Sequence, residues 1–287
     1  MEKTNHFNLP APLVKALTGN HKLPVKGRYS VTSLIDSPLR RCLSMSHGAE
    51  IETDVSENLW MLLGTAVHFV IEQSGSGDQE VKIEKPYGDG TIVGVVDHYD
   101  PTTRTITDWK ITSVYSVLKG VKSEWASQLN CYTYLLDVPV DKVQIYAILR
   151  DWSRTAYAKE VNNLFQSKEN AYPPVPFVNI SVPLWGKEKV NQYIKERIEL
   201  HKLAEESELK DIPQCTEEER WTRPPKFAVA KKPQDRATRL LDTKEDAEKY
   251  ISEKKLVGYQ IFDRPGQDVR CLDYCGVSKF CPYKGAK

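Results

Sequence analysis

The feature that most constrains this chain is a pair of apolar, strand-like runs that meet at a turn between Gly94 and Lys110. The turn is Asp100-Pro101-Thr102-Thr103, and a type I turn favours Asp at its first position and Pro at its second. Apolar residues flank the turn on both sides: Val93, Val95, Val96, Ile106, Trp109 and Ile111. The pattern predicts a β-hairpin that belongs to a folded core.

Each run of this hairpin carries an acidic residue, Asp97 in the first and Asp108 in the second. If the hairpin is symmetric about Thr102 and Thr103, the two carboxylates lie across from each other with Cβ atoms about 5 Å apart; a bulge would shift that register. Lys110 projects from the same face as Asp108. Because charge in apolar surroundings is costly, the pattern favours a divalent-cation site, and a solvated hairpin face is the competing interpretation.

Composition excludes some classes of protein. The 287 residues carry 40 Lys+Arg against 39 Asp+Glu, so any nucleic-acid binding must use local patches rather than net charge. No segment is apolar enough to span a membrane, and the first residues lack a signal peptide's apolar core. Six cysteines without a secretory signal indicate a reducing cytoplasm, where clustered cysteines more often bind metal.

Periodicity around the hairpin predicts helix, three strands, helix, strand. The first helix begins at a Thr53 or Asp54 cap and ends near Gly75; a strand follows over 79–87, and a second helix and a further strand are expected over 123–136 and 142–150. His68 and Glu72 share one helical face, and Gln128 and Tyr132 share another. This order predicts an α/β (α+β) core with a mixed sheet.

The remaining segments are expected to decorate this core. A short helix is predicted over 30–35, before Arg40 and Arg41, which could contact phosphate or lie at a solvated helix end. A proline-rich connection over 171–183 leads to a packing helix over 187–207. A capped helix over 216–221, strands over 226–232, 236–241 and 256–263, and a helix from Thr243 form an appendage. The expected organisation is a partly basic segment 1–53, a core 54–185, and a C-terminal part 186–287.

The tail places Cys271, Cys275 and Cys281 within eleven residues, which is typical of a structural metal site. Pro282 after the last thiol, with Tyr274, Phe280 and Tyr283 as an apolar shield, favours an iron–sulfur cluster over zinc. The fourth ligand is expected from Cys215, which precedes a capped helix, or else from Cys42; Cys131 is expected in the core.

Together these residues resemble the PD-(D/E)xK nuclease superfamily, and within it the RecB-like branch. The matching positions are Gly64 and His68 on the first helix, Asp97 after Gly94, Asp108-Trp109-Lys110, and Gln128 with Tyr132. The tail is similar to the cysteine staple of CRISPR-associated RecB-like exonucleases and of the AddB nuclease domain. The Cys215–Trp221 stretch resembles phage-encoded members of the group.

The resemblance implies a restriction-endonuclease-like αβββαβ core with helical additions and a small C-terminal cysteine-cluster subdomain. It implies that His68, Asp97, Asp108 and the Trp109 carbonyl hold Mg²⁺ or Mn²⁺. Lys110 would orient the attacking water or stabilise the transition state, and Gln128 and Tyr132 would position the DNA backbone or the lysine. Cys215, Cys271, Cys275 and Cys281 would hold a [4Fe–4S] cluster, with zinc as the alternative metal.

The tail departs from its relatives in having three residues between its first two cysteines instead of two. In those relatives the fourth cysteine precedes the nuclease core, which favours Cys42, whereas the phage-like stretch favours Cys215.

The function that these observations and the resemblance predict is a metal-dependent DNA nuclease. An exonuclease acting on single strands or on duplex ends in recombination, repair or phage DNA metabolism is favoured over an endonuclease. It would act in the cytoplasm, that of the host if phage-encoded, and a recombination or replication protein is a possible partner. DNA contact is expected at Arg40, Arg41, Lys231, Lys232 and Arg236. The alternative is a non-cleaving DNA-binding scaffold of the same fold for a recombination or packaging partner; an RNA substrate is a third interpretation.

Overall fold

The computed structural model describes residues 2–19, 23–75, 77–118, 120–161, 171–233 and 236–284. Its contacts divide the chain into two compact units, Met1–Ile212 and Pro213–Lys287, and each is described by itself. Within the described ranges no helix combines the length and the hydropathy of a bilayer-spanning segment.

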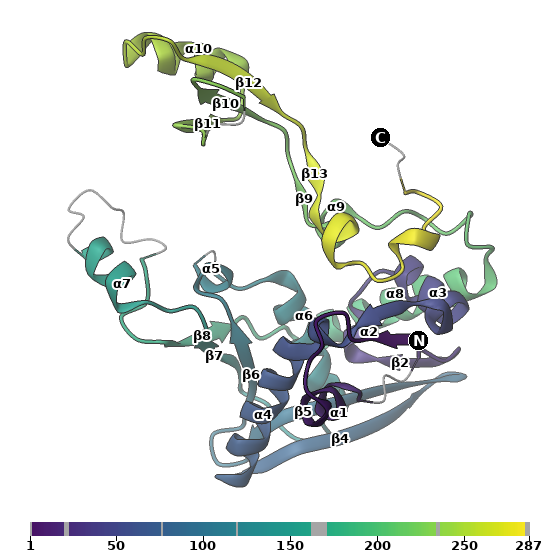
Figure 1. Cartoon of the computed structure of the whole chain (residues 1–287). Helices are drawn as coiled ribbons and strands as arrows, with labels where there is room; N and C mark the ends of the chain where they lie inside the picture. Colours follow the sequence, from purple (N-terminus) through teal and green to yellow (C-terminus); the bar gives the residue numbers. More distant parts are fainter. Residues whose placement is uncertain are drawn as a thin grey trace. The chain divides into compact units, whose positions relative to one another are not determined.

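The first unit is built on a six-stranded mixed sheet (Figure 1). Its strands are β2 (Arg28–Ser30), β4 (Asp78–Tyr87), β5 (Gly90–Asp100), β6 (Thr105–Thr112), β7 (Lys142–Leu149) and β8 (Phe177–Val182). β5 pairs antiparallel with β4 and β6 and parallel with β2, while β7 lies parallel to β6 and antiparallel to β8. Parallel strands need a crossover connection, and the helices between β6 and β7 supply it.

The helices around the hairpin are α4 (Leu59–Gln73) before β4, and α5 (Val114–Val117) and α6 (Ser123–Leu135) between β6 and β7. The core therefore runs α4, β4, β5, β6, α6, β7, which is the predicted order of helix, three strands, helix and strand. The expected α/β class with a mixed sheet is confirmed.

The hairpin register is symmetric about Thr102 and Thr103, as predicted. His98 pairs with Thr107, Tyr99 with Ile106, and Asp100 with Thr105. The Asp100 carboxylate closes the turn, because its Oδ1 accepts the Thr102 N–H at 2.9 Å and its Oδ2 accepts the Thr103 hydroxyl at 2.7 Å.

Helix α6 covers one face of this sheet and buries Trp125, Leu129 and Leu135. Its approach is close at Gly94 of β5, where an added Cβ would stand 2.7 Å from Leu135 Cδ1 and 3.1 Å from Tyr132 Cε1. Cys131 is 1 % exposed, so its predicted place in the core is confirmed. Glycine at position 94 therefore lets the helix carrying Tyr132 lie directly on the strand carrying Asp97.

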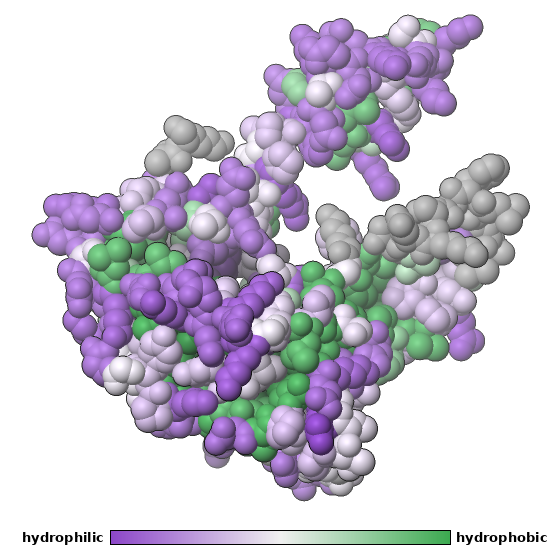
Figure 2. Space-filling model, turned by 180° about the vertical axis from the view of Figure 1, so that it is seen from behind, coloured by the Kyte–Doolittle hydropathy of each residue, from purple (hydrophilic) through white to green (hydrophobic). Residues whose placement is uncertain are grey.

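Helix α4 forms where the sequence predicts it, after a capping box between Asp54 and Glu57 that opens the short helix η2 (Val55–Asn58). Its apolar residues are not fully buried, and the residues Trp60 and Val70 are 61 and 66 % exposed. Figure 2 shows apolar surface of this kind interrupting the hydrophilic exterior of the first unit.

The N-terminal segment contributes β1 (Glu2–Thr4), paired in parallel with β3 (Glu52–Asp54), and the helices α1 (Ala11–Leu17), α2 (Val31–Leu34), α3 (Pro38–His47) and η1 (Gly48–Glu50). The predicted short helix is α2, capped by Ser30, whose side chain accepts the Ser33 N–H. Helix α3 was not predicted.

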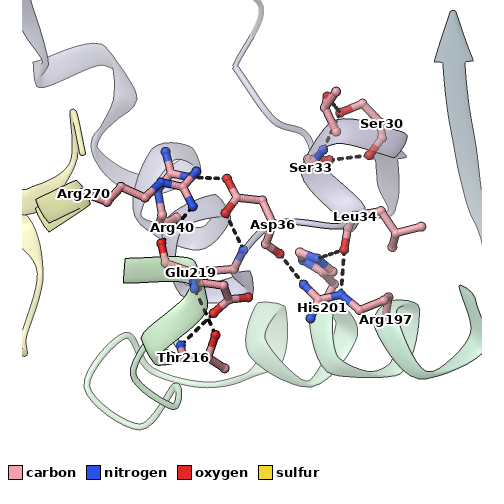
Figure 3. A network of polar contacts seen from close by, with 12 residues as sticks. Ser30, Ser33, Leu34, Asp36, Arg40, Arg197, His201, Thr216, Glu219 and Arg270 are labelled. Carbon is pink, nitrogen blue, oxygen red and sulfur yellow. Dashed lines mark hydrogen bonds and ion pairs between the residues drawn. The ribbon is translucent and has the colours of Figure 1, made fainter. Parts of the chain in front are cut away.

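The long helix α8 (Lys187–Glu206) packs on α2 and α3 and belongs to the first unit. The Leu34 carbonyl accepts hydrogen bonds from Arg197 Nε at 2.8 Å and His201 Nε2 at 3.1 Å (Figure 3). Burial is the main cause that lowers the pKa of His201 to about 4, and the positive charge of Arg197 adds to it.

The prediction of a proline-rich connection over 171–183 is wrong in one respect, because this segment contains the strand β8. β8 pairs with β7, from Val182 opposite Val143 to Phe177 opposite Ile148. Prolines at positions 173, 174, 176 and 183 flank the strand rather than interrupt it. A strand bounded by prolines at a sheet edge is compatible with the missing N–H of proline. Before β8 lies the helix α7 (Arg154–Val161).

The second unit contains α9 (Glu217–Arg220), a two-stranded pair of β9 (Thr222–Arg223) and β13 (Gln267–Asp268), and a three-stranded sheet. That sheet has the order β11 (Arg239–Leu241), β10 (Lys226–Ala230), β12 (Gln260–Arg264), and α10 (Lys244–Glu253) packs against it. The short turns η3 (Arg270–Tyr274) and η4 (Ser278–Phe280) form the tail. The predicted caps hold: Thr216 forms a capping box with Glu219, and Thr243 accepts the Asp246 N–H.

Candidate active site

The candidate site lies where one edge of β5 loses its partner. β4 occupies one edge of β5 along residues 90–99. The other edge must therefore be shared by two strands: β2 pairs with residues 91–93, and β6 pairs with residues 98–100. Residues 94–97 therefore pair with neither β2 nor β6. Asp97 is the last residue of this gap, and it continues the hairpin register to a position opposite Asp108.

Asp97 replaces the interrupted ladder with its side chain. Its Oδ2 accepts the main-chain N–H of Trp109 at 2.9 Å. His68 of α4 completes the group: its Nε2 donates to the Trp109 carbonyl at 3.0 Å, and its Nδ1 lies 3.7 Å from Asp97 Oδ2. The peptide groups on both sides of Trp109 are thus held by side chains from β5 and α4.

Asp108 leads into a second chain of contacts that ends on α6. The Lys110 ammonium lies 3.0 Å from Asp108 Oδ1 and 2.8 Å from its Oδ2, and it donates to Gln128 Oε1 at 3.3 Å. Gln128 Nε2 in turn donates to the Tyr132 hydroxyl at 2.9 Å. The helical spacing of Gln128 and Tyr132 that the sequence showed is used for this contact.

The electrostatics of the site are those of two carboxylates in an apolar setting. Asp108 is 2 % exposed, and the Asp97 side chain is 17 % exposed. Burial, and next the negative charge of Asp108, raise the pKa of Asp97 to about 6, against the lowering effects of the Trp109 N–H, His68 and Lys110. Burial also raises the pKa of Tyr132, so its hydroxyl is a neutral hydrogen-bonding group.

The donor chemistry of this site suits a hard divalent cation. Two carboxylates and the Trp109 carbonyl are oxygen ligands of the type that Mg²⁺ and Mn²⁺ prefer, and a cation would offset the repulsion that raises the pKa of Asp97. In the part of the chain that the structure describes, however, no three His, Cys, Asp or Glu side chains already form a metal-binding group. The Lys110 ammonium occupies the neighbourhood of Asp108 in this arrangement.

Four of the predicted cluster cysteines belong to the second unit. Cys271 is partly buried, and burial, followed by the nearby charges of Cys275, Asp268 and Cys281, raises the pKa of its thiol. Cys215 is 9 % exposed. Among the described residues these thiols do not form a ready metal-binding group, and Cys42, the alternative fourth ligand, is buried in α3 of the first unit.

The segment that follows Cys215 is bound to the tail by several contacts. Arg270 Nη1 donates to the Glu219 carbonyl at 3.0 Å, and the ring centroids of Trp221 and Tyr274 lie 5.4 Å apart. Arg220 Nε lies 3.1 Å from Asp268 Oδ2. These contacts hold the residues that follow Cys215 against the segment that contains Cys271.

The basic residues expected at DNA differ in their surroundings. Arg41 is 4 % exposed and pairs with Glu205, so it does not present its charge to a phosphate, which corrects that expectation. Arg40 pairs with Asp36. Lys231, Lys232 and Arg236 of the second unit are exposed.

The sequence interpretation missed two side chains near this site, the Trp109 indole and Gln144. For Trp109 the sequence predicts a role of the main-chain carbonyl alone. Gln144 is a single amide in strand β7, whose other residues are apolar or aromatic apart from Lys142, yet it is 5 % exposed. A lone amide in such a strand is the signal that could have found it.

Comparison with known proteins gives limited similarity. The chain matches no family model and no curated protein. Among solved structures it is similar to SSO0001, with a TM-score of 0.43 and 17% identity over 66% of this chain and 84% of that one. It is also similar to a phage related exonuclease from Haemophilus somnus 129PT, with a TM-score of 0.37 and 13% identity over 62% of this chain and 93% of that one. The functional argument therefore rests on the residues of this chain.

Proposed function

We propose that this chain is a metal-dependent DNA nuclease, most specifically an exonuclease acting on DNA ends. The observation that carries the proposal is the convergence of His68, Asp97 and Asp108 with Lys110, Gln128 and Tyr132 from two helices and two strands. These are the residues, in the same order, through which the sequence resembles the RecB-like nucleases.

In this proposal each side chain has a task. Asp97, Asp108, His68 and the Trp109 carbonyl would hold Mg²⁺ or Mn²⁺, whose chemistry is to lower the pKa of a bound water and to offset charge on the scissile phosphate. Lys110 would orient that water or stabilise the transition state. Gln128 positions the ammonium, and Tyr132 fixes the orientation of Gln128.

We also propose that Cys215, Cys271, Cys275 and Cys281 hold a [4Fe–4S] cluster with a structural role. The four thiols belong to one unit, and the Cys215 segment is bound to the tail by Arg270, Trp221 and Asp268. Zinc is the alternative occupant, since four thiolates also suit a tetrahedral zinc site.

The experiment that tests the nuclease proposal compares wild-type protein with Asp108→Asn on end-labelled single-stranded and duplex DNA. Protein purified without oxygen is incubated with Mg²⁺ or Mn²⁺. We expect cleavage by the wild type and a loss of about a hundredfold or more in the variant, because one ligand charge is removed. Asp141→Asn, which removes an exposed carboxylate paired with Arg104 at 3.5 Å, is the matched control and should cleave normally.

The second candidate function is a non-cleaving DNA-binding scaffold. The observation that favours it is the Lys110 ammonium, which contacts both oxygens of Asp108 and neutralises the carboxylate without a metal. Wild-type protein that binds DNA but leaves both labelled substrates intact with either metal would establish the scaffold and overturn the nuclease.

A further inference from the structure

Helix α4 is far more apolar than its place at the surface of the first unit explains. Among its 15 residues, LWMLLGTAVHFVIEQ, the ionisable ones are His68 and Glu72, and yet none of the 15 is buried. The other described helices of ten or more residues, α3, α6, α8 and α10, all bury side chains. A helix that keeps so much apolar surface exposed marks an interaction site.

The apolar residues on the solvent side of α4 form one stripe along the helix. They recur at intervals of three, four and seven residues, which places them on a single helical face. The stripe consists of Leu59, Leu62, Leu63, Ala66, Phe69 and Val70. Phe69 and Val70 are 58 and 66 % exposed, and Leu59, Leu63 and Ala66 are exposed as well. His68 belongs to the opposite face, from which it contacts the Trp109 carbonyl.

The composition of the stripe selects the kind of partner. Apolar side chains of these sizes and exposures leave on the order of 500 Å² uncovered, more than half of the about 800 Å² that each partner buries in a stable protein interface. A membrane-surface helix carries Lys or Arg beside its apolar face, and α4 has neither. Interfaces between identical chains are more apolar than transient ones, and a second copy is available to cover the stripe whenever the chain is made.

The order of residues in the stripe is also self-complementary. A two-fold contact requires that residue i meets residue j of the partner and that j meets i. If two copies of α4 cross antiparallel at Ala66, residues at equal distances before and after it share a layer: Leu63 with Phe69, and Leu62 with Val70. The small Ala66 side chain then lies where the helices approach most closely, and large side chains meet on both sides of it.

We propose that this chain forms a two-fold dimer through the stripe, with α4 of one copy packed antiparallel on α4 of the other. The contacts of His68 lie on the opposite face of the helix, so the copies pair without using the candidate active site. The proposal therefore stands or fails separately from the nuclease.

The test measures the mass of the full-length protein by sedimentation equilibrium over a range of micromolar concentrations. We expect twice 32.7 kDa for the wild type. Phe69→Glu and Val70→Glu should each weaken dimerisation by about a hundredfold or more, because the new carboxylate would be buried without a partner. Both positions are exposed in a single copy, so far-UV circular dichroism should show unchanged helix content.

Met61→Glu is the matched control for these substitutions. Met61 is also an exposed apolar residue of α4, at 45 %, but its position on the helix lies outside the stripe. The variant should dimerise as the wild type does.

The antiparallel register is tested by mixing two variants. Leu63→Lys should pair weakly with itself, but mixed with Phe69→Glu it should form a heterodimer, because the ammonium of one chain lies in the same layer as the carboxylate of the other. Positions 63 and 69 are six residues apart and are not neighbours on one helix, so the recovery reports a contact between copies. A mixture no more associated than either variant alone contradicts the antiparallel crossing.

Two results overturn the dimer as a whole. One is a wild-type protein that stays monomeric at every concentration, and the other is a dimer that Phe69→Glu and Val70→Glu leave as tight as before. If Phe69→Glu does not fold, Val70→Glu decides. Monomeric wild-type protein that co-sediments with vesicles of anionic phospholipid would assign the stripe to a membrane surface instead.

Discussion

Lys110 is the residue on which the two candidate functions differ most. It bridges Asp108 and Gln128, so the same ammonium can neutralise a carboxylate in a scaffold or serve the reaction in a nuclease. Lys110→Ala should lower cleavage by about a hundredfold or more, since a donor aimed at the reacting group is lost. It should bind Mn²⁺ at least as well as the wild type, because the ammonium beside Asp108 is removed. Cleavage assays and calorimetric Mn²⁺ titration check both halves.

The matched control for this substitution is Lys85→Ala. Lys85 is also partly buried and donates to a main-chain carbonyl, that of Tyr134 at 2.8 Å, but it is not part of the candidate site. It should cleave as the wild type does. Weaker Mn²⁺ binding in Lys110→Ala would show that the lysine holds the site together rather than acts in the reaction.

At the same scale, the sequence predicts most of the residues that meet in the candidate site but not how Asp97 and Arg41 are bound. Strand and helix periods predict which side chains share a face, and the structure brings these residues into contact: His68, Asp97, Asp108, Lys110, Gln128 and Tyr132. Their roles stay predictions. The use of the Asp97 side chain in place of a strand partner could not be predicted, because it depends on β2 ending its ladder at Val93. The buried Arg41–Glu205 pair joins residues far apart in sequence, and no local pattern signals it.

At the scale of elements, the packing of α6 on β5 depends on Gly94. In Gly94→Ala the new Cβ would meet the side chains of Leu135 and Tyr132 at less than ordinary contact distance, so these side chains or the helix that carries them must shift. We expect a loss of about 1–3 kcal/mol in the free energy of unfolding, which urea denaturation measures. Cleavage should fall as well, because Tyr132 orients Gln128 and through it Lys110.

Gly64 of α4 provides the comparison. Nothing lies within 4 Å of an added Cβ there, and the residue is inside a helix. Gly64→Ala should therefore stabilise the protein by about 1 kcal/mol. Equal effects at positions 94 and 64 would mean that the close approach of α6 to β5 has no energetic consequence.

The docking of α8 on α2 should make stability depend on pH. Burial lowers the pKa of His201 to about 4, whereas an unfolded histidine has a pKa of about 6.5. The unfolded chain therefore takes up a proton first, and stability that is fully present above pH 6.5 is lost as the pH falls toward 4, by about 3 kcal/mol in total. Urea midpoints across this range should show the loss.

His201→Gln removes the titrating group, so its stability should change less over the same pH range. His6→Gln, which changes an exposed histidine, is the control and should keep the pH dependence of the wild type. A wild-type profile that stays flat from pH 6.5 to 4 would place the His201 ring in a more solvated environment than its contact with Leu34 implies.

The elements that the sequence predicted are those with strong local signals. Helix α6 and β7 have clear periods, and the caps of α9 and α10 were identified from their residues. β8 was missed because three prolines precede it closely and its ladder partner, β7, is remote in sequence. Helix α3 was missed because its apolar positions are few and its buried side chains include Arg41.

At the scale of the whole molecule, the chain separates its two proposed centres. The acidic site lies in the unit Met1–Ile212, which has the continuous core around the mixed sheet, whereas Cys215 and the tail cysteines lie in Pro213–Lys287. The second unit has small sheets, so its tail depends on the contacts of Arg270 and Trp221 and, in our proposal, on the metal that the thiols would hold. Loss of that metal should therefore affect the second unit first.

The cysteines give the prediction with the most distinct outcomes. Protein purified without oxygen should be brown and carry about four irons per chain, and alanine at Cys271, Cys275 or Cys281 should remove the colour, since each thiolate holds one corner of the cluster. Cys215→Ala should do the same, whereas Cys42→Ala and Cys131→Ala, which change buried thiols of the first unit, should stay brown.

Metal binding energy is also folding energy, so the colourless variants should expose the second unit to proteolysis while the fragment 1–212 stays resistant. Bleaching by Cys42→Ala instead of Cys215→Ala would transfer the fourth ligand to the first unit, and colourless wild-type protein with one tightly held zinc would replace the cluster by a zinc site.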